Sequence, residues 1–296
     1  MSSVNKLGII GIGNWGKNLV RDFSKYGEIT KCTSKGNPKN ISWLKKNYPL
    51  IEYVANEKEI FNDDKINAVV ISTPIKTHYM LVKNALLSKK HVFVEKPLCS
   101  NLVEANELLK IAKRSNLLLF VGHIFQFNEI LNKLKKIIMK EKITYVYFEW
   151  NKFGTFDEDI FLNLLSHDIS IILKLFGKPK KSELVSSFGF ISKCDIFTLN
   201  FKFNNNVNCQ VHMNRYSNKK QKLVSIFTKN NMYLWDNLKL YKINKKTNMH
   251  KLVFESNVSP LELECKKFIE NLHEPKKSIE YAILAKDVIQ VIQKLK

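Results

Sequence analysis

The sequence lacks any apolar run long enough to cross a bilayer. Its longest uncharged, mostly apolar stretch, near residues 116–128, is too short and contains His123 and Gln126. No cationic segment followed by an apolar run and a cleavage site opens the chain. We therefore expect a soluble, cytoplasmic protein with no membrane partner.

Cysteine is sparse as well. The five cysteines are odd in number and widely spaced, and none forms a CxxC pair. This pattern argues against both a disulfide framework and a zinc site. We expect reduced, mostly buried thiols and no bound metal.

Arginine is nearly absent, although the formal net charge is +21. It supplies three of the 48 basic residues, at positions 21, 114 and 215, and the lysines are spread along the whole chain. Forked recognition of phosphate and guanine prefers arginine, so this composition predicts a solvated basic surface and no nucleic-acid partner. Such a surface attracts anionic small molecules. Steep salt-dependent retention on DNA or RNA would contradict this interpretation.

Glycine is also scarce, yet four of the ten glycines fall within GIIGIGNWG at residues 8–16. A glycine inside a strand or helix costs roughly 0.5–1 kcal/mol relative to alanine, so the cluster indicates a positive φ or a close backbone approach. Gly11, Gly13 and Gly16 form GxGxxG between an apolar strand pattern and a helical pattern. In that context they permit a tight turn, the approach of a pyrophosphate and close helix packing.

The first 120 residues alternate strand-like and helix-like segments. Strands are predicted at 6–12, 29–34, 51–54, 67–72, 90–95 and 116–122, and the clearest helical patterns lie at 78–89 and 101–116. This βαβα order is typical of a doubly wound parallel sheet covered by helices on both faces. We expect residues 1–122 to form a Rossmann dinucleotide-binding domain.

Beyond residue 143 the apolar period changes to two. Strands are predicted at 143–150, 182–192, 195–203, 207–216, 222–229 and 232–236, with Phe197, Phe201 and Phe203 in the core. Helices are predicted at 160–176, ending at Gly177, and near 260–273 and 279–295. We expect residues 123–296 to form an α+β domain for substrate binding and oligomerisation. Its sheet would be open-faced and mostly antiparallel, and its last helix able to pack back on the first domain.

The absence of acidic residues near the end of the second predicted strand bears on which nicotinamide cofactor binds. No Asp or Glu lies between Ile29 and Ile51, and the second strand ends Thr33-Ser34-Lys35. A carboxylate at this point binds the ribose 2′-hydroxyl of NAD, whereas a cation accommodates a 2′-phosphate. The sequence favours NADP(H), with NAD(H) as the alternative.

Two further motifs complete a family resemblance. NAVVISTPIKTHY at 67–79 and HVFVEKPL at 91–98 resemble the Gfo/Idh/MocA family of sugar and inositol oxidoreductases, and so do VGHIFQFN at 121–128, NLLSHDISI at 163–171 and PLELECKKFIENL at 260–272. The resemblance implies a set of cofactor-binding residues: Gly11, Gly13, Asn14, Trp15, Gly16, Ser34, Lys35, Ser72, Thr73, Pro74, His78, Glu95 and Lys96.

The same resemblance implies the catalytic groups. Lys96 of the EKP triplet would lie beside the reacting carbinol, where an ammonium can polarise a carbonyl or stabilise an alkoxide. His167 would be the general acid or base, because imidazole titrates near neutrality. Both would also contact substrate.

One position departs from the family pattern. Asn163 replaces the usual aspartate four residues before His167, and an amide can hydrogen-bond but cannot accept the proton. Asp168 follows His167 directly but projects about 100° away on a helix, so it does not replace the missing group. We expect either a reductase that depends on Lys96 and His167 or a protein of altered activity.

Besides Asn163, four further residues are candidates for substrate binding. These are Gln126, Asn128, Lys152 and Phe153, which we expect to face the cleft between the domains. The resemblance implies hydride transfer between nicotinamide and a ring carbon of a sugar. We expect a nucleotide-linked keto-sugar of bacterial surface-polysaccharide or amino-sugar biosynthesis and a homodimer or homotetramer. The alternative is a cofactor-binding regulatory or catalytically degenerate protein of the same fold.

Overall fold

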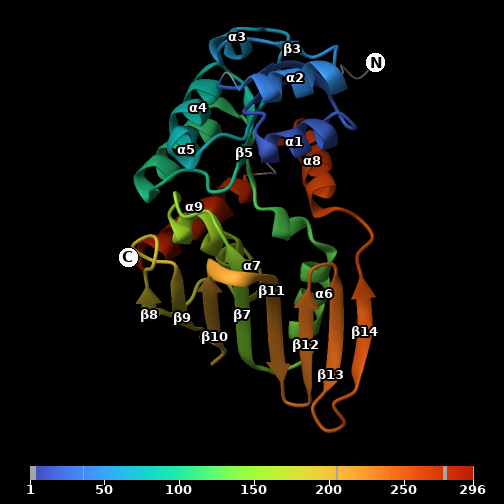
Figure 1. Ribbon diagram of the computed structural model, residues 1–296, viewed down its shortest axis with the longest axis vertical. Helices are drawn as coiled ribbons and strands as arrows, with labels where there is room; N and C mark the ends of the chain where they lie inside the picture. Colours follow the sequence, from blue (N-terminus) through green and yellow to red (C-terminus); the bar gives the residue numbers. More distant parts are fainter. Residues whose placement is uncertain (1–4, 36, 205, 276–278, 296) are drawn as a thin grey trace. The chain divides into compact units, whose positions relative to one another are not determined.

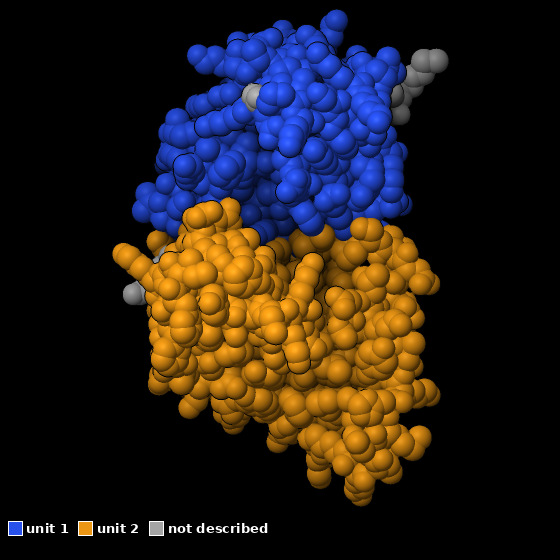
Figure 2. All heavy atoms as spheres, in the orientation of Figure 1, with its two compact units in different colours: residues 1–123, 261–289 blue, residues 124–260, 290–296 orange. Residues whose placement is uncertain are grey.

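The computed structural model describes residues 5–35, 37–204, 206–275 and 279–295 of the chain. The chain divides into two compact units (Figures 1 and 2). Residues 1–123 and 261–289 form unit 1, and residues 124–260 and 290–296 form unit 2. Each unit is described by itself.

Unit 1 is built on a six-stranded parallel sheet of order β3-β2-β1-β4-β5-β6. Its strands are β1 (Lys6–Ile10), β2 (Glu28–Thr33), β3 (Glu52–Tyr53), β4 (Ala68–Ile71), β5 (His91–Glu95) and β6 (Leu119–Gly122). Its helices are α1 (Asn14–Phe23), α2 (Pro38–Asn47), α3 (Lys58–Phe61), α4 (Ile75–Leu87), α5 (Leu102–Ser115), α8 (Pro260–Asn271) and α9 (Glu280–Gln293). This is the predicted doubly wound Rossmann sheet.

Helices cover both faces of this sheet, which is why its strands are continuous apolar runs. On one face Phe23 of α1 and Phe268 of α8 pack edge-on against Phe93 of β5, with ring centroids 5.2 and 5.6 Å away. The other face packs against α4, α5 and α9, with Val82 and Ala285 completely or almost completely buried. Figure 1 shows α1 and α8 on one side of β5 and α4 and α5 on the other. The C-terminal helices thus complete the first unit.

Unit 2 contains an eight-stranded sheet of order β14-β13-β12-β11-β7-β10-β9-β8. The strands are β7 (Ile143–Phe153), β8 (Lys181–Phe188), β9 (Ile196–Lys202), β10 (Asn208–Asn214), β11 (Tyr216–Thr228), β12 (Asn231–Asp236), β13 (Lys239–Asn244) and β14 (His250–Glu255). Only the β10–β7 pair is parallel among the pairings of the described strands. The expected mostly antiparallel sheet is confirmed.

Four helical segments belong to unit 2: a 3₁₀ turn η1 (Ile124–Phe127), α6 (Glu129–Ile138), a π-helical turn η2 (Phe161–Leu165) and α7 (Ser166–Phe176). The aromatic stripe expected in the core is buried, with Phe197 and Phe201 fully enclosed and Phe203 4% exposed. Alternate residues of β9 and β10 remain partly exposed, as period-two patterning requires.

Two features differ from the sequence expectations. Residues 239–255 form strands β13 and β14, which the apolar pattern did not predict, because lysines interrupt the alternation there. Lysine is common on edge strands, where it opposes unwanted pairing, and β14 is such an edge. The helix predicted at 160–176 begins instead with the π-helical turn η2, and α7 ends at Gly177 with φ +74°.

The described part of the chain holds no helix that is both long and apolar enough to cross a membrane. All five cysteines carry free thiols, and only Cys194 is partly exposed. Within the same residues no cluster of three or more metal-ligating side chains occurs.

Candidate functional site

The glycine loop of unit 1 joins β1 to α1, and two of its glycines are required by the protein itself. Gly11 has φ +98°, and a Cβ there would lie 2.2 Å from the carbonyl oxygen of Ser72. A Cβ on Gly16 would lie 2.1 Å from the carbonyl oxygen of Gly11. Both positions therefore exclude any side chain.

Gly13 is different, because it has an ordinary φ of −67° and a Cβ there would meet no protein atom within 4 Å among the described residues. It is the N-cap of α1, and no described side chain caps this helix or places an acid in its first turn. The first N–H groups of α1 are thus free of the usual side-chain acceptors. These features fit close approach of an anionic group such as a pyrophosphate.

A groove of about 560 Å³ opens at the carboxyl ends of the strands, beside this loop. The order of the sheet reverses between β1 and β4, and ligands bind open α/β sheets at such a point. Seven of the thirteen predicted cofactor residues line the groove: Gly11, Gly13, Ser34, Lys35, Ser72, Thr73 and Pro74. The residues present fit a dinucleotide.

The groove also contains charged residues that the sequence pattern did not single out. Glu57, just before α3, and Lys76 in the first turn of α4 line the same groove as Lys35. The groove therefore holds one carboxylate and two ammonium groups. The sequence search for an acid ended at Ile51 and missed Glu57, which approaches from the segment after β3.

His78 does not line the groove. Its side chain is buried, with Nδ1 2.7 Å from the carbonyl oxygen of Pro97 and Nε2 2.8 Å from that of Thr73. Burial lowers the pKa of His78, and the two carbonyl contacts partly oppose this effect. His78 thus links the segment after β4 to the segment that follows Lys96.

Lys96 follows β5, and its neighbours form a buried cluster. The indole Nε1 of Trp15 donates to Glu95 Oε1 at 2.5 Å, which ties the glycine loop to the end of β5. His123 is 2% exposed and neither ring nitrogen has a hydrogen-bond partner among the described residues. Burial, and then the nearby Lys96 ammonium, lower the pKa of His123 to about 3, so its imidazole is neutral at physiological pH.

A second carboxyl group from α8 lies near Glu95. Glu264 is fully buried, and neither of its oxygens has a hydrogen-bond partner in the described part of the chain. Burial raises the pKa of Glu95 to about 7, against the opposing effects of Trp15 and Lys96. Burial and then Glu95 raise the pKa of Glu264 well above its ordinary value. Both carboxyl groups therefore hold their protons to a higher pH than exposed carboxyl groups do.

In unit 2, His167 lies in the first turn of α7 against two aromatic rings. Its ring centroid is 5.3 Å from that of Phe125 on η1 and 5.4 Å from that of Trp150 on β7. Asn163 lies in the π-helical turn η2 and is 9% exposed. A π-helical turn here gives the four-residue spacing a different geometry from that of a regular α-helix, and such turns are frequent at functional sites.

Asp168 is fully buried and forms an ion pair with Lys222 of β11. The Lys222 ammonium also lies 3.9 Å from the Trp150 ring centroid and 4.8 Å from that of Phe125. Phe125 and Lys222 line a small cavity of about 70 Å³ together with Val224, Trp235 and Asn237. The side chains around His167 therefore come from four elements, η1, β7, α7 and β11.

Two of the candidates for substrate binding, Gln126 and Asn128, form hydrogen bonds to the backbone. Gln126 Nε2 donates to the carbonyl oxygen of Ser170 at 2.8 Å, which links η1 to α7. Asn128 is 2% exposed and caps α6 by accepting from the backbone N–H of Ile130 at 2.9 Å. Their contact with a substrate stays a prediction.

Lys152 and Phe153 lie on opposite faces of β7, because neighbouring side chains of a strand alternate. Lys152 shares a face with Trp150 and hence with the His167 region. Phe153 is 64% exposed and contacts Phe156 and Tyr216. The structure thus groups Lys152, but not Phe153, with His167.

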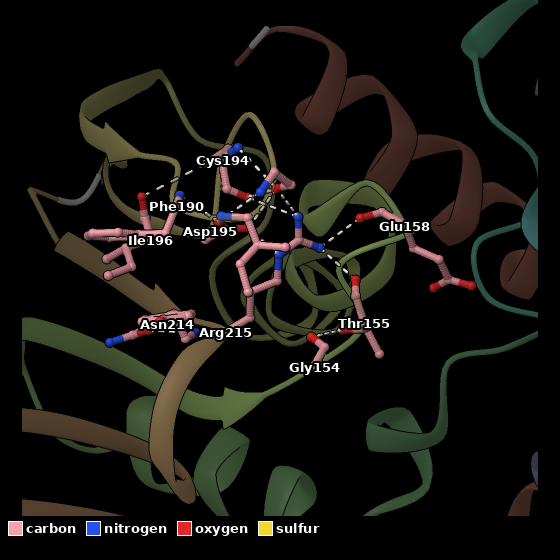
Figure 3. Close-up of polar contacts among 12 residues, drawn as sticks. Gly154, Thr155, Glu158, Phe190, Cys194, Asp195, Ile196, Asn214 and Arg215 are labelled. Atoms are coloured by element: carbon pink, nitrogen blue, oxygen red, sulfur yellow. Dashed lines mark hydrogen bonds and ion pairs between the residues drawn. The ribbon is translucent and has the colours of Figure 1, made fainter.

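Arg215, between β10 and β11, holds the segment that leads into η2 (Figure 3). Its Nη1 donates to the carbonyl oxygens of Thr155 and Glu158, both at 2.7 Å, and its Nε donates to Asp195 at 3.0 Å. Both side chains are almost completely buried. Burial opposes ionisation of Asp195, but hydrogen bonds from Ser192 and nearby backbone N–H groups hold its pKa well below the usual range.

Known proteins share this architecture. The family described as oxidoreductase family, NAD-binding Rossmann fold (Gfo/Idh/MocA) matches residues 5–123. This match confirms the resemblance to the Gfo/Idh/MocA family for residues 5–123.

Two curated relatives illustrate the similarity. The uncharacterized oxidoreductase YdgJ of Escherichia coli is 30% identical over 196 residues, which cover 60% of this chain and 56% of YdgJ. The scyllo-inositol 2-dehydrogenase (NADP(+)) IolW of Bacillus subtilis is 28% identical over 194 residues, covering 59% of this chain and 52% of IolW. These matches span about half the length of each relative.

A solved structure is similar over nearly the whole chain. It is the UDP-N-acetylglucosamine 3-dehydrogenase GnnA from Acidithiobacillus ferrooxidans, with a TM-score of 0.87 and 19% identity. The match covers 98% of this chain and 96% of GnnA. At this identity the likeness shows that the two proteins share a fold across both units.

Sequence reasoning missed three groups that the structure brings out: Glu57, Lys222 and Arg215. Glu57 and Lys222 have no local signal, since each belongs to a charged surface-like segment. Arg215 did have one, because it is one of three arginines in a lysine-rich chain. Arginine is the residue suited to a buried, multiply hydrogen-bonded ion pair.

Proposed function

We propose that the protein is an NAD(P)-dependent oxidoreductase that transfers hydride between nicotinamide and a ring carbon of a nucleotide-linked sugar. The observation that carries this proposal is the groove at the switch point of the unit 1 sheet, bordered by Gly11, Gly13 and the open N-terminus of α1. A dinucleotide bound there would supply the hydride donor or acceptor.

The chain's own residues supply binding and proton transfer. Lys96 follows the end of β5, and its ammonium would hydrogen-bond the reacting oxygen and stabilise negative charge as it develops. His167 would exchange the proton of the sugar hydroxyl. The buried cluster around Glu95 holds the segment that carries Lys96, and Arg215 holds the segment that precedes the His167 helix.

An anionic substrate is supported by the lysines of unit 2. Burial, followed by repulsion from Lys220, lowers the pKa of Lys152 on the His167 face of β7. Two ammonium groups held near each other attract a diphosphate, and the net charge of +21 acts in the same direction. GnnA, named for its action on UDP-N-acetylglucosamine, makes a nucleotide-linked sugar the first substrate class to test.

The direct test combines binding and turnover. Purified protein should bind NADPH or NADH in calorimetry and oxidise or reduce a UDP-linked amino sugar or its keto form. Lys96→Ala should reduce turnover by about 10²-fold or more, as loss of an oxyanion-stabilising donor does. Lys83→Ala, which removes a half-buried lysine paired with Glu107, is the matched control and should leave turnover unchanged. Failure of the wild-type protein to bind either dinucleotide would disprove the proposal.

NADP(H) is the cofactor we favour. Lys35 and Ser34 at the end of β2 line the groove and suit a 2′-phosphate, whereas Glu57 in the same groove suits a 2′-hydroxyl. Lys35→Met should weaken NADPH binding about tenfold relative to NADH, and Glu57→Gln should shift the ratio the other way. A preference for NADH in the wild-type protein would reverse the assignment.

A second copy of the chain is the macromolecular partner we propose. Exposed aromatic side chains gather at one end of the unit 2 sheet, with Phe190 stacked on Tyr216 at 5.3 Å and Phe153 5.8 Å from Tyr216. Contiguous exposed apolar side chains are a feature of interaction surfaces, whereas single ones are ordinary. Sedimentation should show a dimer or tetramer that Phe190→Asp dissociates, and a wild-type monomer would contradict the proposal.

The alternative is a cofactor-binding regulatory or catalytically degenerate protein, which Asn163 in place of aspartate favours. Asn163→Asp separates the two. A large gain in turnover would indicate a degenerate site, whereas a loss would mean that asparagine is the working residue.

A further inference from the structure

Asp168 directly follows His167 in the chain, and its ion pair with Lys222 has no role in the proposed mechanism. Asp168 is fully buried, and its Oδ1 contacts the Lys222 ammonium. Its Oδ2 has no hydrogen-bond partner among the described residues. Without Lys222, the buried Asp168 carboxylate would be an uncompensated charge. It would then destabilise the fold or shift the pKa of the nearest ionisable group.

The ammonium and the imidazole share the same two aromatic neighbours. Lys222 is directly opposite Trp150 in the β11–β7 pairing, and its Nζ lies 3.9 Å from the Trp150 ring centroid and 4.8 Å from that of Phe125. His167 contacts these two rings at 5.4 and 5.3 Å between centroids. The Lys222 ammonium therefore pairs with Asp168 and also contacts the two aromatic rings against which His167 packs.

Burial acts on both members of the pair. It raises the pKa of Asp168 and lowers that of Lys222, and in each case the charge of the partner opposes the shift. The charges of the pair cancel at short range, so neither reaches the imidazole alone. Removing one member of the pair would leave the uncompensated charge of the other near His167.

Few other charged groups belong to the elements packed against His167. η1 and η2 carry none. On β7, Glu149 accepts from Asn151 Nδ2, and Lys152 is the remaining cation. On α6, Glu129 accepts from Ser256 Oγ, and Lys133, Lys135 and Lys136 are exposed. On β11, Lys219 and Lys220 are exposed.

We propose that Lys222 is a positioning residue for His167, which neutralises the neighbouring Asp168 carboxylate and so sets the charge that the imidazole experiences. With Asn163 in place of aspartate, both carboxylates that could promote imidazole protonation are then withdrawn: one by substitution, the other by pairing. The inference rests on the proposed function only for the role of His167 in proton transfer.

The test is the titration of His167 in the full-length protein without substrate or cofactor. The Cε1–H resonance would be followed by NMR from pH 4.5 to pH 9 and assigned with His167→Gln. Lys222→Met should raise the titration midpoint by about 0.5–1 pH unit, because Asp168 becomes uncompensated. Asp168→Asn should lower it by a similar amount, because the ammonium becomes uncompensated. The double variant should return it close to the wild-type value.

A matched control is Lys133→Met, which removes another ammonium from an aromatic face in the same unit, 4.7 Å from the Phe254 ring centroid. It should leave the midpoint unchanged. Opposite shifts in the two single variants support the proposal, whereas no shift or two shifts of the same sign overturn it. If Lys222→Met does not fold by circular dichroism, the nearly isosteric Asp168→Asn decides the matter by whether the midpoint falls.

The same variants give a kinetic readout that separates this proposal from the proposed function. The pH profile of kcat should move with the NMR midpoint in each variant. A protein that shows the opposite NMR shifts but no turnover would contradict the oxidoreductase proposal while supporting the role of Lys222.

Discussion

The two units form their candidate sites by different means. Unit 1 shapes its groove mainly with backbone: Gly11 adopts a positive φ, Gly16 packs on a carbonyl oxygen, and the strand ends of a parallel sheet line the space. Unit 2 forms the surroundings of His167 with side chains that meet from η1, β7, α7 and β11. A site made of backbone is recorded in a short motif, whereas one made of side-chain contacts is distributed over the chain.

We expect the largest effect from removing a buried side-chain contact network of unit 2. Arg215→Met removes the ion-pair partner of the buried Asp195 carboxylate and the guanidinium donor to the carbonyls of Thr155 and Glu158. We expect the free energy of unfolding of unit 2 to fall by about 3–5 kcal/mol, as when a buried ion pair loses one partner. Urea unfolding followed by circular dichroism measures the loss.

Arg114→Met, the same change on an exposed arginine at the end of α5, provides the control and should cost less than about 1 kcal/mol. Equal losses for the two variants would mean that the Arg215 contacts contribute little.

A pair of glycine substitutions tests whether the backbone of the glycine loop forms the groove of unit 1. Gly11→Ala places a Cβ 2.2 Å from a backbone oxygen at φ +98°, so it should cost about 2–4 kcal/mol of stability and abolish dinucleotide binding. Gly13→Ala meets no described protein atom and has an ordinary φ, so the fold should tolerate it while dinucleotide binding weakens tenfold or more. If Gly13→Ala binds as well as the wild-type protein, the loop does not contact the ligand there.

The smallest expected effect concerns the buried carboxyl group of unit 1. Because burial raises the pKa of Glu95 to about 7, above its ordinary value of 4.5, the folded chain binds this proton more tightly than the unfolded chain does. The resulting stability is complete below about pH 4.5 and is lost as the pH rises through about 7.

Glu95→Gln should therefore gain about 2 kcal/mol relative to the wild-type protein between pH 5 and pH 8, measured by thermal unfolding. Glu270→Gln, on the exposed side of α8, should show no such pH dependence relative to the wild-type protein. A difference between Glu95→Gln and wild type that stays constant with pH would show that Glu95 keeps its charge throughout this range.

Much of unit 1 is predictable because its signals are local. The glycine spacing, the apolar strands and the order of the elements led to the parallel sheet, and Ser34, Lys35, Ser72, Thr73 and Pro74 follow from strand ends. Glu57 could not be found in this way, since it enters the groove from the segment after β3. In unit 2, β13 and β14 escaped prediction because their lysines hide the alternation.

The substrate-binding candidates show the same limit. Phe153 and Lys152 are adjacent in sequence, yet only the strand geometry reveals that they occupy opposite faces of β7. Gln126 and Asn128 are polar residues in a family-like segment, and the structure shows that their amides bond to the backbone of α7 and α6.

Local chemistry was therefore enough to identify the dinucleotide-type loop and the Rossmann order of elements, because glycine conformation and side-chain periodicity act over a few residues. The Lys96 and His167 candidates came from the family resemblance. The pairing of Asp168 with Lys222, 54 positions away, and the contacts of Arg215 with Thr155 and Glu158 were settled by folding alone. Strand register decides which of many similar lysines faces inward, and register depends on contacts that span the whole sheet.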